Sequence, residues 1–182
     1  MRGVHYSSDL LTGQNPEKVV VCCSDSRESE TKYTNWEFVP GKIFVVRNAG
    51  NCALFPDALA SIRYAALHLN VKEIEIAGHY NCGMMNALLS FEEEKDEVIK
   101  EACEFIILKV FQGYENVKGK TPEELAKINV VNQVKILSED NVIKNWLKNG
   151  GILKGTYFDF SKTPLFVETL VVEKGNGEND DS

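Results

Sequence analysis

Two short apolar runs rich in β-branched residues constrain the fold of this 182-residue chain more than any other feature. They cover residues 18–23 (KVVVCC) and 42–46 (KIFVV), and turn-forming residues precede each run. Neither run alternates between apolar and polar residues, which indicates strands buried on both faces, as in a parallel sheet. A third short strand is expected at residues 74–77, ending at Gly78.

Helical patterns fill most of the chain between and after these strands. Pro56-Asp57 opens a segment in which apolar residues recur at near-helical spacing as far as Leu69. Further helices are expected at residues 83–89, 95–110, 122–137 and 141–147.

A different pattern follows the break at Gly150-Gly151. Residues 152–160 and 165–172 alternate partly between apolar and polar side chains, and residues 161–164 (SKTP) between them are typical of a turn, which predicts a hairpin. Strands that alternate with helices and end in a hairpin predict an α/β fold. We therefore expect a central, mainly parallel β-sheet flanked by helices, with a C-terminal β-hairpin.

No internal repeat or low-complexity linker divides the chain, so we expect a single domain over residues 1–172. About 43% of the residues are hydrophobic, which is enough for a sizeable core. Residues 173–182 are acidic and rich in glycine and asparagine, which predicts a flexible tail.

Charge and hydropathy argue against several kinds of partner. The net charge of −7, from 27 acidic and 20 basic residues, argues against nucleic acid and against an anionic membrane. No apolar run reaches the roughly 18 residues that span a bilayer, and the N-terminus lacks the apolar stretch of a signal peptide. The five cysteines are an odd number in a chain without a visible secretory signal, which favours reduced thiols over disulfides. A cytoplasmic protein is expected.

Reactive and polar residues converge on one edge of the predicted sheet. Cys23 ends the first strand, residues 47–51 (RNAGN) follow the second, and Gly78-His79 follows the third. Ligands collect at the carboxyl ends of the strands in open parallel sheets, so we expect the functional site there.

Three residues at this edge suit a metal ion. His79 and Cys82 form an H-x-x-C pair, whose spacing lets both side chains reach one ion, and sheet pairing would bring Cys23 to them. Zinc prefers thiolate and imidazole ligands, and a catalytic zinc keeps three protein ligands and an open position. Spacing alone leaves a simpler alternative, because cysteine is often only a small buried apolar residue.

The residues around these ligands carry a more specific resemblance. In order along the chain, C-S-D-S-R from Cys23, R-N-A-G-N from Arg47 and G-H-Y-N-C-G from Gly78 resemble the β-carbonic anhydrase family. The G-Q-N-P element from Gly13 is also similar, and the resemblance runs from about Leu10 to Val172. It implies zinc bound by Cys23, His79 and Cys82, and reversible hydration of carbon dioxide to bicarbonate and a proton.

The resemblance also implies roles for residues that do not bind the metal. Asp25 would orient a zinc-bound hydroxide toward carbon dioxide, and Arg27 would keep the Asp25 carboxylate ionised and off the metal. The residues that would line the substrate pocket, some of them from a neighbouring subunit, are Gln14, Phe44, Ala49, Tyr64 and Gly83. Phe44 and Tyr64 could instead be plain core aromatics, and Gln14 an ordinary turn residue. A homodimer or a higher even oligomer is expected.

The chain departs from the family pattern at Val20, at Ala49 and in the short segment before Gln14. Val20 stands where some members carry a tryptophan associated with a self-closing form, so we expect the open form. Ala49 often corresponds to valine, which slightly enlarges the predicted pocket and bears on substrate identity.

Three other functions compete with carbon dioxide hydration. Carbonyl sulfide and carbon disulfide hydrolases resemble the same family and would use the same zinc site. A non-catalytic zinc-binding protein would explain the cysteines, but it gives no task to Asp25 and Arg27 and lacks an evident fourth ligand. Nucleophilic cysteine catalysis with His79 as the base would leave the second cysteine without a role.

Overall fold

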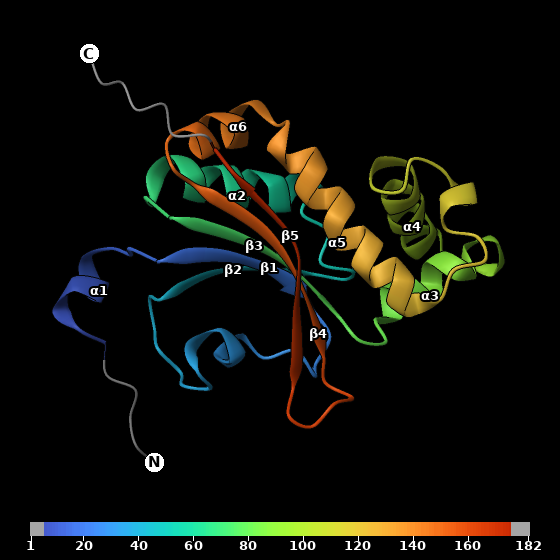
Figure 1. Cartoon of the computed structure of the whole chain (residues 1–182), viewed down its shortest axis with the longest axis horizontal. Helices are drawn as coiled ribbons and strands as arrows, with labels where there is room; N and C mark the ends of the chain where they lie inside the picture. Colours follow the sequence, from blue (N-terminus) through green and yellow to red (C-terminus); the bar gives the residue numbers. More distant parts are fainter. Residues whose placement is uncertain (1–5, 176–182) are drawn as a thin grey trace.

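The computed structural model describes residues 6–175 and contains one five-stranded sheet in the order β2-β1-β3-β4-β5 (Figure 1). The first four strands in this order pair in parallel, and β5 runs antiparallel to β4. The predicted α/β fold, with its mainly parallel sheet and C-terminal hairpin, is therefore confirmed. The strands are β1 Lys18–Cys23, β2 Ile43–Asn48, β3 Glu73–His79, β4 Ile152–Asp159 and β5 Phe166–Lys174.

Three of the described α-helices begin at residues whose side chains cap them. The side chain of Thr121 caps α5 in a reciprocal capping box with Glu124, and the carboxylates of Asp96 and Asp140 cap α4 and α6. The α-helices are α1 Ser8–Thr12, α2 Pro56–His68, α3 Gly83–Leu89, α4 Glu97–Lys109, α5 Pro122–Ser138 and α6 Asn141–Lys148. Short 3₁₀ helices form η1 Glu30–Thr34, η2 Phe91–Glu93 and η3 Tyr114–Asn116.

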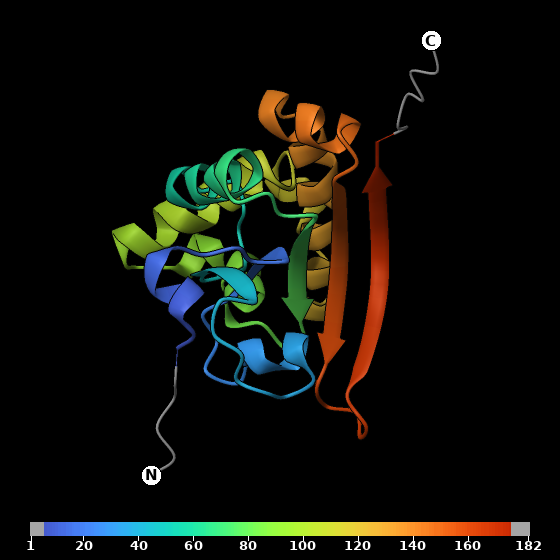
Figure 2. The ribbon, with the colours of Figure 1, turned by 90° about the vertical axis from the view of Figure 1, so that its left-hand side faces the viewer.

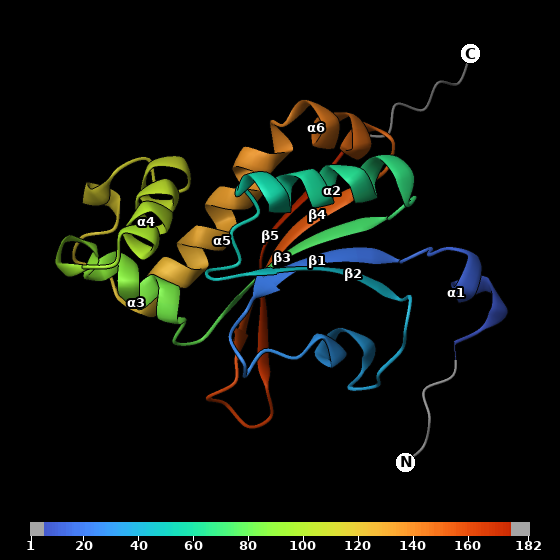
Figure 3. The same ribbon diagram turned by 180° about the vertical axis from the view of Figure 1, so that it is seen from behind.

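The helices cover the two faces of the sheet unequally. Figures 1 and 3 show α2, α5 and α6 together on one face and the η1 segment on the other. The main core lies under the three helices, where Val19, Ile74 and Leu153 of the sheet pack with apolar residues of the helices. The opposite face carries a smaller cluster around Val20 and Phe158.

Helix α5 lies close to the middle of the sheet because two facing positions are glycine. A Cβ atom at Gly78 would lie 2.8 Å from Cγ2 of Val130, and one at Gly155 would lie 2.5 Å from Cγ1 of the same residue. A larger residue at either position would require a shift of Val130 or of the helix that carries it. The two glycines thus set the height of α5 above β3 and β4.

Several predicted boundaries were wrong because the ladders continue into polar sequence. Asn48 pairs with Cys23 and His79 pairs with Phe158, so β2 and β3 include motif residues that were expected to follow them. Strand β5 runs to Lys174, so it includes the first two residues of the predicted acidic tail, while residues 176–182 lie outside the described residues. The sequence did not predict α1 or the 3₁₀ helices.

The hairpin of β4 and β5 extends along one side of the molecule as two long, adjacent strands (Figure 2). Its β5 strand is the outer edge of the sheet and is half exposed at Phe166 and Val167. Within residues 6–175, none of the helices combines the length and the apolar character needed to cross a membrane.

Candidate metal centre

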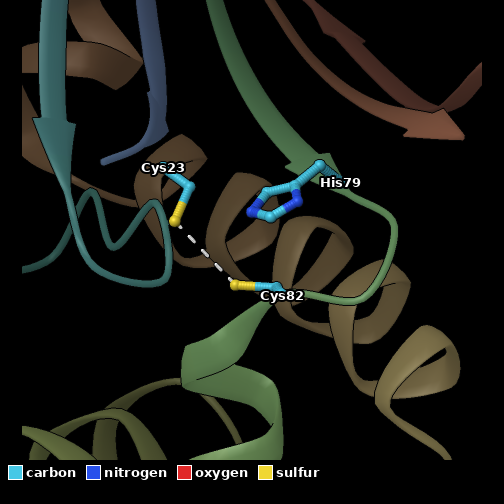
Figure 4. Close-up of side chains that lie close together, drawn as sticks. All are labelled: Cys23, His79 and Cys82. Carbon is cyan, nitrogen blue, oxygen red and sulfur yellow. Dashed lines mark hydrogen bonds between the residues drawn. The ribbon is translucent and has the colours of Figure 1, made fainter. Parts of the chain in front are cut away.

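Three side chains meet at the carboxyl ends of the central strands. Cys23 is the last residue of β1, His79 is the last residue of the neighbouring strand β3, and Cys82 directly precedes α3. Their side chains point toward one another in Figure 4, and their ligand atoms all lie within 4.8 Å of one another. All three residues are buried. The structure thus brings together the three residues that the sequence predicted as metal ligands.

The geometry and the hydrogen bonding of the cluster are compatible with a bound metal ion such as zinc. Two thiolates bound tetrahedrally to zinc at about 2.3 Å lie about 3.8 Å apart, and the sulfur atoms of Cys23 and Cys82 are separated by 3.9 Å. Nδ1 of His79 lies 3.0 Å from the carbonyl oxygen of Tyr80, whereas the buried Nε2 has no hydrogen-bond partner. When Nδ1 donates to this carbonyl, the lone pair of Nε2 is free for a metal.

The turn between His79 and Cys82 depends on Asn81. This residue has a φ of 48°, in the left-handed region that asparagine tolerates better than most residues. The turn brings Cys82 back beside His79, where it serves as the N-cap residue of α3. The turn thereby allows both residues of the H-x-x-C pair to face the same metal position.

Asp25 and Arg27 form an ion pair at the edge of the cluster. Nε of Arg27 donates to Oδ1 of Asp25 at 2.8 Å, and Nη2 donates to Oδ2 at 2.6 Å. The same Nη2 donates to the carbonyl oxygen of Asn81 at 3.0 Å. These hydrogen bonds hold the pKa of the Asp25 carboxyl well below its usual range. Oδ2 of Asp25 lies 4.0 Å from Nε2 of His79, so an ionised carboxylate stands beside the candidate metal position.

The side chain of Arg47 organises the loop that carries this pair. Its guanidinium donates to the carbonyl oxygens of Cys23, Asp25 and Glu28, at distances between 3.0 and 3.2 Å. The sequence identified Arg47 as the first residue of the R-N-A-G-N motif but did not predict a structural role for it. Its position on the strand next to Cys23 was the signal available for this role.

Two buried amides of α5 hold the neighbouring loop. Oε1 of Gln133 accepts from the backbone N–H of Ala53 at 2.6 Å, and the side chain of Asn129 donates to the carbonyl oxygen of Gly50 at 3.1 Å. The two amides also bond to each other, and both residues are fully buried. The sequence predicted the helix but not this network, since both residues also suit an ordinary helix surface.

Gln133→Leu is expected to lower the free energy of unfolding by about 1–3 kcal/mol, because the N–H of Ala53 is left buried without an acceptor. Urea unfolding followed by circular dichroism measures the change. Lys135→Leu changes an exposed position of the same helix and should stay within about 0.5 kcal/mol of the wild type. Equal stability of the two variants would contradict a structural role for Gln133.

The pKa values of Cys23, Cys82 and His79 depend on one another, because the three side chains lie close together. The hydrogen bond from Cys82 lowers the pKa of Cys23, while the same bond and burial raise the pKa of Cys82. Burial disfavours the charged form of His79, but the neighbouring Cys23 thiolate and its negative charge outweigh burial and raise the imidazole pKa. A metal must therefore displace at least the proton of Cys82.

Zinc affinity is accordingly expected to increase with pH. Since a thiol with a raised pKa holds its proton throughout the neutral range, the apparent association constant should rise about tenfold or more per pH unit between about pH 6 and 8. Competition with a chelator at fixed pH measures the affinity, and calorimetry in buffers of different ionisation enthalpy counts the released protons. Affinity independent of pH, without proton release, would contradict this account.

The predicted pocket residues fall into two groups. Gly83 directly follows Cys82, and Ala49 directly follows Asn48, which pairs with Cys23; both residues are exposed. Phe44 lies four positions before the end of β2, about 13 Å along the strand from the metal end. Its ring is 6.4 Å from that of Tyr64, which is 48% exposed, and Gln14 is exposed before β1. The structure does not bring Gln14, Phe44 and Tyr64 to the metal centre of their own chain.

The remaining cysteines do not belong to the three-ligand cluster. Cys22 points to the opposite face of the sheet, where it packs with Val20 and Phe158, and burial raises the pKa of its thiol to about 12. Cys52 and Cys103 are fully buried. In the part of the chain that the structure describes, no second group of three metal-ligating residues occurs.

Comparison with known sequences places most of this chain in one family. The carbonic anhydrase family model matches residues 18–165. A carbonic anhydrase from Synechocystis sp. (strain ATCC 27184 / PCC 6803 / Kazusa) is 31% identical over 157 residues, which cover 79% of this chain and 56% of the relative. This chain spans about half the length of the curated relatives that it matches.

Solved structures share the fold over nearly the whole chain. The β-carbonic anhydrase CcaA superposes with a TM-score of 0.72 at 26% identity, covering 92% of this chain and 82% of that chain. A structure from a study of two tetrameric β-carbonic anhydrases of the ascomycete Sordaria macrospora superposes with a TM-score of 0.71 at 26% identity. That match covers 91% of this chain and 86% of the fungal chain.

Proposed function

The chain belongs to the β-class carbonic anhydrase family, and from this we propose that it reversibly hydrates carbon dioxide to bicarbonate and a proton with one zinc ion. Cys23, His79 and Cys82 would hold the zinc. The observation that carries the proposal is the buried three-ligand cluster, with sulfur atoms at tetrahedral spacing and an unpartnered Nε2 of His79.

The ligand set favours a catalytic over a structural zinc. Structural sites are normally closed by four protein ligands, whereas catalytic sites keep one position open. Among the described residues, the cluster comprises three ligands only, and the adjacent carboxylate of Asp25 is engaged by Arg27. Bound zinc supplies a Lewis acid that lowers the pKa of water, so that a nucleophile is present near neutral pH.

Asp25 would orient the attacking water. Its carboxylate stays ionised because its pKa is held low, so its oxygens can only accept hydrogen bonds. A water molecule that donates to Oδ2 turns a lone pair away from Asp25 and toward carbon dioxide. This fixed orientation lowers the entropic part of the barrier.

Arg27 would keep that acceptor in place. Its two parallel hydrogen bonds match the geometry of a carboxylate, and its third bond, to Asn81, ties the guanidinium to the turn between the ligands. Without this restraint the carboxylate of Asp25 could itself occupy the open metal position. Arg27 therefore maintains the open form of the site.

We place the working enzyme in an even oligomer. Gln14, Phe44 and Tyr64 lie away from the metal centre of their own chain, so a pocket that includes them requires a second subunit. The similar fungal β-carbonic anhydrases are tetrameric. The five free cysteines suit a reducing compartment such as the cytoplasm.

Stopped-flow measurement of carbon dioxide hydration, with zinc quantified in the same preparation, tests the proposal. Rapid hydration with about one zinc ion per chain supports it. One zinc per chain without hydration between pH 7 and about pH 9 contradicts it, and carbonyl sulfide is then the substrate to test on the same site.

A further inference from the structure

Phe160 packs against one of the metal-centre side chains and against two side chains beside it. It directly follows β4, and its ring stacks on the imidazole of His79 with the ring centroids 5.7 Å apart and an interplanar angle of 23°. The guanidinium carbon of Arg27 lies 4.8 Å from the centroid of the same ring. The ring of Tyr80 meets Phe160 edge-on at 6.1 Å. One aromatic side chain thus contacts a metal ligand and the arginine that restrains Asp25.

The sheet register determines this position. His79 pairs with Phe158 across β3 and β4, and the N–H of Tyr80 donates to the carbonyl oxygen of Phe158. Residues two apart along a strand point to the same side, so continuation past Phe158 directs Phe160 over the end of β3. The hairpin contributes to the metal centre in this way, although it supplies no ligand.

The ion pair of Asp25 and Arg27 needs support beyond its own hydrogen bonds. The side chain of Arg27 is 46% exposed, and exposed ion pairs hold long side chains weakly because water competes and conformational entropy is lost. An aromatic face attracts a guanidinium and restricts its rotamers. Phe160 and the carbonyl oxygen of Asn81 are the contacts that supply this restraint.

We propose that Phe160 is a positioning residue that keeps Arg27 on Asp25 and thereby keeps the open metal position free of the Asp25 carboxylate. The proposal rests on the proposed function, because it gives Phe160 a task in the same site. The observation specific to it is the simultaneous contact of one ring with His79 and Arg27.

The test uses the cobalt(II)-substituted protein, with azide as a probe of the open position. In Phe160→Ala, azide affinity, read from the visible spectrum of cobalt, is expected to fall about fivefold because the Asp25 carboxylate competes for the metal more often. Phe160→Tyr retains the ring and should restore affinity to within about twofold of the wild type. Phe166→Ala removes a half-exposed aromatic from the same hairpin and should leave azide affinity unchanged.

A double-mutant cycle with Asp25→Ala separates positioning from general loosening of the site. If Phe160 acts through the Asp25–Arg27 pair, Phe160→Ala has no effect on azide affinity once the carboxylate is absent. An unchanged azide affinity in the single variant, or an equal loss in both backgrounds, overturns the proposal. These readouts do not depend on turnover, so a wild-type protein that fails to hydrate carbon dioxide would refute the proposed function alone.

Discussion

Cys82→Ser is expected to reduce the zinc content of the purified protein from about one ion per chain to below about 0.1, and to abolish carbon dioxide hydration with it. A serine hydroxyl stays protonated near neutral pH and is a poor zinc ligand, so only Cys23 and His79 remain. The fold should survive, because Cys82 is the N-cap of α3 and serine is favourable at that position. Metal analysis, circular dichroism and stopped-flow hydration on one preparation check all three statements.

The matched control for this variant is Cys103→Ala. Cys103 is as buried as Cys82 but contacts the sulfur of Met84 rather than the other ligands. The Cys103→Ala protein should be less stable than the wild type, but it should bind zinc and hydrate carbon dioxide. Full zinc occupancy and activity in Cys82→Ser would exclude this cysteine as a ligand.

Arg27→Ala is expected to keep about one zinc ion per chain and to lose hydration activity by about 100-fold or more, since Asp25 would no longer be held as an oriented acceptor. Removing the guanidinium also lets the pKa of Asp25 return toward its ordinary value. Stopped-flow hydration of metal-analysed protein measures the loss. Arg27→Lys keeps the charge without the two-pronged geometry and should give an intermediate rate.

Two other results for Arg27→Ala would contradict the expected loss of activity with retained zinc. Full activity of Arg27→Ala would show that Asp25 needs no partner to stay off the metal. Loss of zinc together with activity would indicate that Arg27 holds the turn of Asn81, to which it donates its third hydrogen bond, and so acts on the ligands themselves.

The fold was predictable because the first two strands are apolar runs, the hairpin strands alternate partly, and most helices show apolar residues at helical spacing. The segment between Glu28 and Gly41 escaped prediction, since it consists of one 3₁₀ helix and turns, including Asn35 and Trp36 at positive φ. Such a segment has no regular spacing of apolar residues from which its structure could be predicted. The strand ends were misplaced for a related reason: the polar residues Arg47 and His79 resemble loop sequence, but their backbones still complete ladders.

The metal cluster was predictable because Cys23 and His79 stood at the ends of strands that a parallel sheet must bring together, and Cys82 followed His79 at the spacing of a ligand pair. The contacts that hold the cluster in place were not predictable from the sequence. Gln133 reaches the N–H of Ala53 across 80 positions of sequence, and Phe160 reaches Arg27 only through the register of the hairpin. Contacts of this kind follow from the relative placement of elements, which local patterns do not encode.

Two of the ligands end adjacent strands and the third lies three residues after β3, which has a consequence for the order of folding. Cys23 and Cys82 are 59 positions apart, so their approach requires the long-range pairing of β1 with β3 and the closure of a large loop. Such pairings form slowly compared with helices. All three ligands can therefore bind zinc only after the central strands have paired. The rate of zinc uptake during refolding would then report the rate at which β1 pairs with β3.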